Sequence, residues 1–112
     1  MRGCFALLML TALGACSSQS DKQLEAVKAA RSVIAEWALV EQQADRGQVQ
    51  ATYAGQMRKM AKDELKTAQA GLAQQPDASN LLEKLRSDSP DAAALKQADD
   101  ALKPVENSLE AS

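Results

Sequence analysis

Apolar side chains recur three and four residues apart along most of this sequence, and that spacing constrains the fold more than any other feature. It is the spacing of one buried face on an α-helix. The pattern is interrupted at Gly47, Pro76 and Pro90. Aromatic residues make up only 3% of the 112 residues, whereas a β-sandwich needs many β-branched and aromatic side chains. The sequence therefore predicts a single small all-α domain.

The first two predicted helices form a long hairpin. One is expected from Asp21 up to Gly47, and the next over residues 51–75. Ser20 and Gln23 fit a capping box at the start of the first helix, and Gly47 fits a left-handed or frayed end. Because the connection is short, we expect the two helices to be antiparallel. The predicted inward residues are Leu24, Val27, Ala30, Ile34, Trp37, Val40 and Ala44, then Tyr53, Met57, Met60, Leu65, Ala68 and Leu72.

The remaining residues predict one or two shorter C-terminal helices. Asp77 fits the N-cap of the first of them, and Ser89, followed by Pro90, fits the N-cap of the last. Pro104 falls inside the last apolar pattern, so we expect that helix to be kinked or broken near Lys103. The final residues are expected to fray. Residues 21–112 are thus the predicted helical domain.

Charge is distributed unevenly along this domain. Residues 21–45 carry three basic and five acidic side chains, residues 46–76 carry five and two, and residues 77–112 carry four and eight. We expect this pattern to favour packing of the second helix between two acidic segments, although each exposed ion pair contributes only about 0–1 kcal/mol. With a net charge of -2 and no run of basic residues, no nucleic-acid partner is expected.

The N-terminal residues have the composition of an export signal. Arg2 is followed by the uncharged stretch "CFALLMLTALGA", which is too short to span a bilayer as a mature helix. The sequence "LGAC", ending at Cys16, resembles the lipobox of bacterial lipoprotein signals. The resemblance implies removal of residues 1–15, attachment of a diacylglycerol to the Cys16 thiol, and acylation of its amine. An ordinary signal peptide or an uncleaved anchor with an incidental Cys is the alternative.

The residue that follows Cys16 indicates which of the two bacterial membranes would hold the anchored protein. In lipoproteins of two-membraned bacteria an Asp there favours the inner membrane; here it is Ser17, so the resemblance implies the outer membrane, facing the periplasm. Residues 16–20 are then a lipidated Cys and a polar flexible tether. Beyond the signal, the chain does not resemble the major murein lipoprotein, because its helices are interrupted and it lacks a C-terminal Lys.

Four large side chains are candidates for partner binding: Trp37, Tyr53, Met57 and Met60. Trp37 is primarily interpreted as a core anchor, with a binding hot spot as the alternative. The two methionines are expected to point inward, with Arg58 and Lys59 forming a solvated face. Exposed methionines would instead indicate an adaptable groove for a partner.

The composition leaves little for catalysis. The chain has no His, which excludes Ser-His-Asp triads and His-ligated zinc. Cys4 and Cys16 both precede the domain, so no disulfide is expected within it. The carboxylates of Asp99, Asp100 and Glu106 do not lie in the loop that calcium binding requires. We expect no catalytic residue, no cofactor and no metal.

The most direct functional interpretation is a membrane-anchored, non-enzymatic interaction or envelope-structural protein, with an envelope protein or a second copy as its partner. An alternative is a carrier of an apolar ligand or lipid between the helices. In that case Ala30, Ala61 and Ala68 would leave a gap, whereas close packing is the default. An enzyme would need a carboxylate or Lys with a strongly shifted pKa in a cleft.

Overall fold

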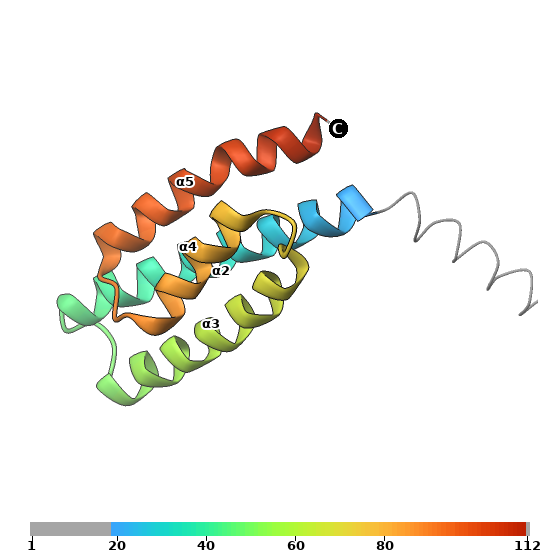
Figure 1. Cartoon of the computed structure of the whole chain (residues 1–112). Coiled ribbons are helices and arrows are strands. Elements are labelled where there is room, and N and C mark those ends of the chain that lie inside the picture. Colours follow the sequence, from blue (N-terminus) through green and yellow to red (C-terminus); the bar gives the residue numbers. More distant parts are fainter. Residues whose placement is uncertain (1–18, 112) are drawn as a thin grey trace, which may run out of the picture.

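The computed structural model describes residues 19–111, which form four α-helices in this part of the chain (Figure 1). The predicted all-α fold is confirmed, with a long hairpin followed by two shorter helices. Cys16 and most of the predicted tether lie outside the described residues. The helices are α2 (Gln19–Asp45), α3 (Ala51–Gly71), α4 (Pro76–Ser87) and α5 (Ala92–Glu110).

Each helix packs against two others. α2 contacts α3 and α5, while α4 contacts the same two helices. Neighbouring helices run in opposite directions (Figure 1). In cross-section, α2 and α4 therefore occupy opposite corners of the bundle, as do α3 and α5. The α2–α3 and α4–α5 grooves consequently lie on opposite sides.

Charge does not determine this arrangement. As expected, α3 lies between two neighbours, α2 and α4, but the most extensive interface joins α2 to α5, whose segments are both acidic. Burial of apolar surface contributes more free energy than exposed ion pairs. The position of α3 therefore agrees with the expectation from segment charge, while the α2–α5 interface does not follow from it.

The core is built from aliphatic side chains, alanines and one indole. On α3 the buried positions are Ala54, Ala61, Leu65 and Ala68, and Leu72 at its C-cap is also buried. The predicted inward positions Tyr53 and Met60 are instead exposed. Alanines at a seven-residue spacing allow α2 and α3 to approach closely, and this places the larger side chains to the side. The largest fully buried side chains are Trp37, Ile34, Leu65, Leu72, Leu82, Leu95, Leu102 and Val27.

Gly47 ends α2 as predicted. Its φ of 69° lies in the left-handed region. The Gln48 amide donates to the Gln43 carbonyl at 2.8 Å, and the Gly47 amide donates to the Ala44 carbonyl at 3.0 Å. These two bonds are those of a Schellman motif, which closes the last turn of the helix. They reverse the chain into α3.

The capping box predicted at the start of α2 is not formed. Ser20 lies inside the helix, which begins by Gln19 within the described residues. The Gln23 side chain does not reach back to form a capping box, because it donates to Gln74 and accepts from Gln75, both at 3.0 Å. These contacts join α2 to the α3–α4 connection. The predicted tether is therefore shorter by two residues.

The two later caps are also displaced. The N-cap of α4 is Gln75, with Pro76 as the first helical residue, so Asp77 lies in the first turn. The N-cap of α5 is Asp91, not Ser89, and its carboxylate accepts from the Ala94 amide at 2.8 Å. Ser-Pro-Asp offers two capping side chains two residues apart, and the local sequence does not distinguish them.

The predicted break in the last helix is wrong. α5 is continuous through Pro104 to Glu110. Pro104 lies on the exposed side of α5, where water can satisfy the carbonyl that loses its amide partner. Val105 and Leu109 pack against the core on the other side. Burial of these two side chains holds the last turns in place.

Candidate functional site

Trp37 is a core residue and presents no surface to a partner. Its side chain is 1% exposed, and its indole N–H donates to Oε2 of Glu41 at 2.8 Å. The interpretation as a core anchor is therefore the one that the structure supports. Of the four predicted binding residues, Trp37 is the one that is removed from the surface.

Glu41 links the indole to the neighbouring helix. Arg58 donates from Nε to Oε2 at 2.6 Å and from Nη2 to Oε1 at 2.8 Å, a bidentate pair between α2 and α3. These bonds lower the pKa of Glu41, against the opposing effect of burial, and the Trp37 bond adds to the lowering. Glu41 is thereby held ionised, which suits a structural ion pair.

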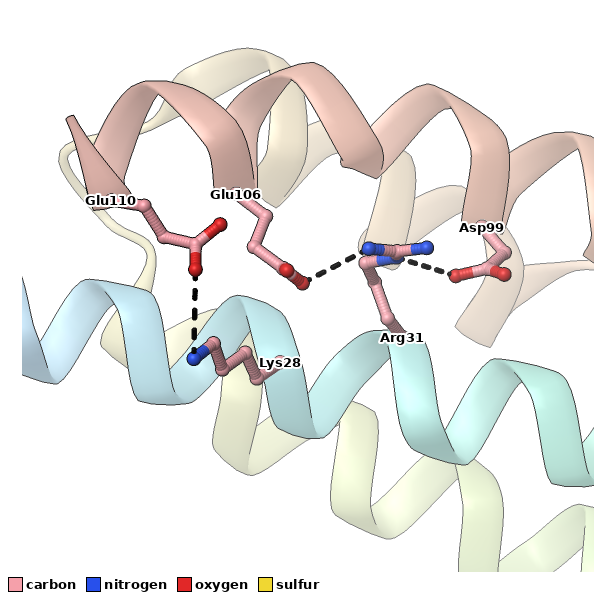
Figure 2. Close-up of polar contacts among 5 residues, drawn as sticks. All are labelled: Lys28, Arg31, Asp99, Glu106 and Glu110. Carbon is pink, nitrogen blue, oxygen red and sulfur yellow. Dashed lines mark hydrogen bonds and ion pairs between the residues drawn. The ribbon is translucent and has the colours of Figure 1, made fainter.

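Arg31 forms the corresponding link between α2 and α5 (Figure 2). Its Nε donates to Asp99 at 2.8 Å and its Nη1 to Glu106 at 3.0 Å. The hydrogen bond to Asp99 is the main cause that raises the pKa of Arg31. Figure 2 also shows Lys28 facing Glu110 at 3.9 Å, a pair whose side chains are both about half exposed.

Two further polar contacts tie the helices together. Gln23 bonds to the α3–α4 connection, and Gln69 on α3 bonds to Glu83 and Arg86 on α4, at 3.0 and 2.6 Å. Throughout residues 19–111, every buried side-chain nitrogen or oxygen has a hydrogen-bond partner. The buried polar groups of this part of the chain thus serve to join the helices.

An exposed apolar face lies on the first half of α3. Tyr53 is 48% exposed and Met60 is 54% exposed, while Met57 is half-buried beside Val33 and Glu36 of α2. The expectation that both methionines point inward is therefore wrong for Met60. We call Tyr53, Met57 and Met60 the α3 face. Exposed methionines are the feature that indicates an adaptable binding surface.

A groove opens between α4 and α5, which contact each other least among the neighbouring pairs. Its volume is about 530 Å³. Leu81, Leu85 and Ala98 contribute to its apolar floor, and Asp88 and Asp91 lie toward one end, where α4 connects to α5. Sequence patterns missed this groove, because it depends on how far apart two helices pack. We call it the α4–α5 groove.

These surfaces share one end of the bundle. We define the proximal end by the start of α2, the α3–α4 connection and the last turn of α5, and the distal end by the two other connections (Figure 1). The α3 face begins at the third residue of α3, and the α4–α5 groove ends at the α4–α5 connection. Leu39, the other large exposed apolar residue among those described, lies in the distal half of α2.

The alanines that could have left a gap face the core, although Ala68 also lines an open surface hollow of about 420 Å³ between α2 and α3. Ala30, Ala61 and Ala68 are all buried. A Cβ added at Gly71 would lie 2.9 Å from the Cβ of Ala26, which shows how closely α3 approaches α2 at the proximal end. The α4–α5 groove lies on the other side of the bundle from these residues.

The described residues contain neither a group of metal ligands nor a helix that could span a membrane. Within residues 19–111, no three His, Cys, Asp or Glu side chains are grouped to hold a metal ion. In the same range, no helix combines the length and hydropathy that crossing a membrane requires. The carboxylates of Asp99 and Glu106, which the sequence places on one face of α5, meet Arg31 instead.

No protein-family model, curated protein or solved structure matches this chain. The surfaces described above are accordingly interpreted from their own contacts and positions. The lipidation predicted at Cys16 concerns a residue outside the described range.

Proposed function

We propose that the protein is a bacterial lipoprotein, held through Cys16 in the outer membrane, whose helical bundle acts in the periplasm as a non-enzymatic interaction or envelope-structural protein. The "LGAC" signal and Ser17 support the anchor and the membrane. The observation that carries the interaction role is that the exposed large apolar side chains and the α4–α5 groove lie in the distal half of the bundle.

The anchor sets the orientation of that end. Cys16 precedes Gln19 by three residues, a separation of at most about 10 Å in an extended chain. The proximal end then lies next to the lipid headgroups. The 27-residue α2 is about 40 Å long, so the distal end can stand well away from the bilayer. Exposed apolar surface at that height suits a protein partner better than a lipid surface.

Confinement to a membrane is what makes a modest binding surface effective. Two-dimensional tethering raises the effective concentration of the bundle near any partner in the same envelope. Two or more acyl chains hold a protein stably, since each buried methylene contributes about 0.8 kcal/mol. The proposed mechanism therefore needs no chemical step by the bundle.

The test combines localisation with a surface variant. Mass spectrometry of the native protein from purified outer membranes should show a diacylglycerol on Cys16, and the Cys16→Ser variant should leave the membrane fraction. Cross-linked complexes purified from membranes should contain a stoichiometric protein partner, and Tyr53→Ser/Met60→Ser should reduce it at least fivefold. Ala70→Ser, at an exposed proximal position of α3, is the matched control.

Two other outcomes of this experiment would contradict the proposed function or favour the carrier. An unmodified Cys16 in the soluble fraction would remove the anchor and with it the assigned location. The second candidate, a carrier of an apolar ligand, is favoured by the volume of the α4–α5 groove, about 530 Å³, which falls in the range of small-molecule sites. A lipid that co-purifies with the anchored protein, without a protein partner, would support the carrier.

A further inference from the structure

We propose that the bundle associates laterally with copies of itself, the α3 face of one molecule occupying the α4–α5 groove of the next. The proposal rests on the proposed function for one premise, that an anchor at Cys16 holds every copy with its proximal end toward the membrane. The partner of the α3 face and of the α4–α5 groove is then a second copy of this chain.

The two surfaces have complementary shapes. The α3 face projects Tyr53 and Met60 from a helix into solvent, whereas the α4–α5 groove is a trough between two helices with Leu81, Leu85 and Ala98 among its lining residues. A groove between packed helices is the shape that a third helix fills with its side chains. Methionine adapts to irregular apolar surfaces, which favours insertion of Met60.

The two surfaces also lie at the same level of the bundle. α3 and α5 both begin at the distal end and run toward the proximal end (Figure 1). Arg58 of α3 pairs with Glu41 of α2, and Arg31, ten residues earlier on α2, pairs with Asp99 and Glu106 of α5. Met60 therefore lies at about the level of the first turns of α5, where Ala94 and Gln97 line the groove. Molecules standing side by side on one membrane would therefore bring the two surfaces to the same height.

The position of the surfaces determines the kind of assembly. α3 and α5 occupy opposite corners of the bundle, since each packs against α2 and α4. A contact that joins opposite sides of successive molecules is heterologous, and each copy can engage two neighbours. The expected product is an open row along the membrane, not a closed dimer.

Charge complementarity selects a second copy over an arbitrary partner. Of the four basic residues of α3, Arg58 pairs with Glu41 within the molecule, and the other three take part in no ion pair among the described residues. The charged residues that line the groove are Asp88, Asp91 and Lys84. Lys59 is adjacent to Met60, and Asp88 lies at the end of the groove. Within residues 19–111 neither Lys59 nor Asp88 takes part in an ion pair. Both charges are thus available to face each other across the contact.

Cysteine cross-linking of the anchored full-length protein tests the contact. Met60→Cys and Gln97→Cys place one thiol on the α3 face and one in the groove, since Gln97 is an exposed lining residue. Copper-phenanthroline treatment of intact membranes should convert the double variant into a ladder of dimers, trimers and larger species. Each single variant alone should stay monomeric, and the two co-expressed single variants should give dimers only.

Matched controls separate this arrangement from others. Ala70→Cys/Gln97→Cys moves the α3 thiol to the proximal end and should give no ladder, and the chain without added cysteines should give no product. Dimers from Met60→Cys alone would overturn the heterologous contact in favour of two α3 faces meeting. A monomeric double variant, or a product between residue 60 and a different envelope protein, would overturn self-association.

Charge reversal provides a second readout that does not depend on thiol geometry. In the Met60→Cys/Gln97→Cys chain, Lys59→Glu or Asp88→Lys should each reduce the ladder at least fivefold, and the two together should restore it. An unchanged ladder in both single reversals would overturn the assigned pairing. Acylation of Cys16 and membrane fractionation are measured on the same samples, so failure of the row and failure of the anchored function are distinguished.

Discussion

The carboxylate of Glu41 on α2 receives the guanidinium of Arg58 on α3 through two hydrogen bonds, at 2.6 and 2.8 Å. The same carboxylate accepts the indole N–H of Trp37, whose side chain is buried. One acidic group therefore satisfies a core donor and holds the distal end of the α2–α3 hairpin together. The loss of Glu41 would affect both contacts at once.

Replacing Glu41 by Ala should lower the free energy of unfolding by about 1–3 kcal/mol, because a buried indole N–H loses its acceptor. Urea denaturation followed by circular dichroism measures the change. Glu36→Ala is the matched control, an exposed Glu on the same helix, and should stay within about 0.5 kcal/mol of the native protein. Equal effects of the two substitutions would contradict the structural role of Glu41.

The stability of the bundle should also depend on pH through Glu41. Its pKa is lowered below the ordinary value of 4.5, first by the bonds from Arg58. A folded-state pKa below the unfolded one stabilises the protein above the unfolded value, and the contribution is lost as the pH falls through the folded value. The difference in unfolding free energy between the native protein and Glu41→Gln should be constant near neutral pH and shrink below pH 4.5. A difference that grows on acidification would contradict this assignment.

Arg31 should contribute far more to stability than Lys28, although both join α2 to α5. Arg31→Ala leaves two partly buried carboxylates, Asp99 and Glu106, facing each other without a cation, and should cost about 1.5–3 kcal/mol. Lys28→Ala removes a half-exposed pair at 3.9 Å and should cost no more than about 0.5 kcal/mol. The urea concentrations at which Arg31→Ala and Lys28→Ala are half unfolded measure the two losses of stability. Similar midpoints for the two variants would contradict the larger contribution of Arg31.

The same substitution at two glycines should have opposite effects. A Cβ has nothing within 4 Å at either Gly47 or Gly55, but only Gly47 has a positive φ. Gly47→Ala should therefore destabilise by about 1–2 kcal/mol through backbone strain, whereas Gly55→Ala should stabilise by about 0.5–1 kcal/mol through helix propensity. Thermal denaturation of both variants provides the measurement. Shifts of the same sign would contradict the assigned end of α2.

The helices could be predicted because their apolar spacing and the glycine that ends α2 are local features. The orientation of α3 was harder to predict, because Tyr53 and Met60 are large apolar side chains at the spacing that is typical of a buried helix face. The true inner face uses Ala54, Ala61 and Ala68, which are individually weak signals of burial. These alanines face inward because α2 lies so close to α3 that only small side chains fit between them. The separation of α2 and α3 depends on both helices, so the sequence of α3 alone does not reveal it.

Polar contacts between distant segments were the least predictable part. Asp99 and Glu106 lie seven residues apart and thus on one face of α5, which is a detectable pattern. Their shared partner, Arg31, is 68 residues from Asp99. The α4–α5 groove was missed for the same reason, because no sequence spacing reports the gap between two helices. Of the two displaced caps, Gln75 bonds to the distant Gln23, whereas Asp91 caps α5 through a local bond to Ala94 that Ser89 could equally have offered.

The pairing of α2 with α5 has a consequence for the order of folding. Closing a chain segment of 68 residues between Arg31 and Asp99 costs more conformational entropy than closing the short connection between α2 and α3. The hairpin should therefore form while α5 is still undocked, as expected when local contacts precede distant ones. During that interval the side of α2 that carries Arg31 remains in water. A chaperone that meets the chain at this stage would find exposed apolar surface on that side of α2.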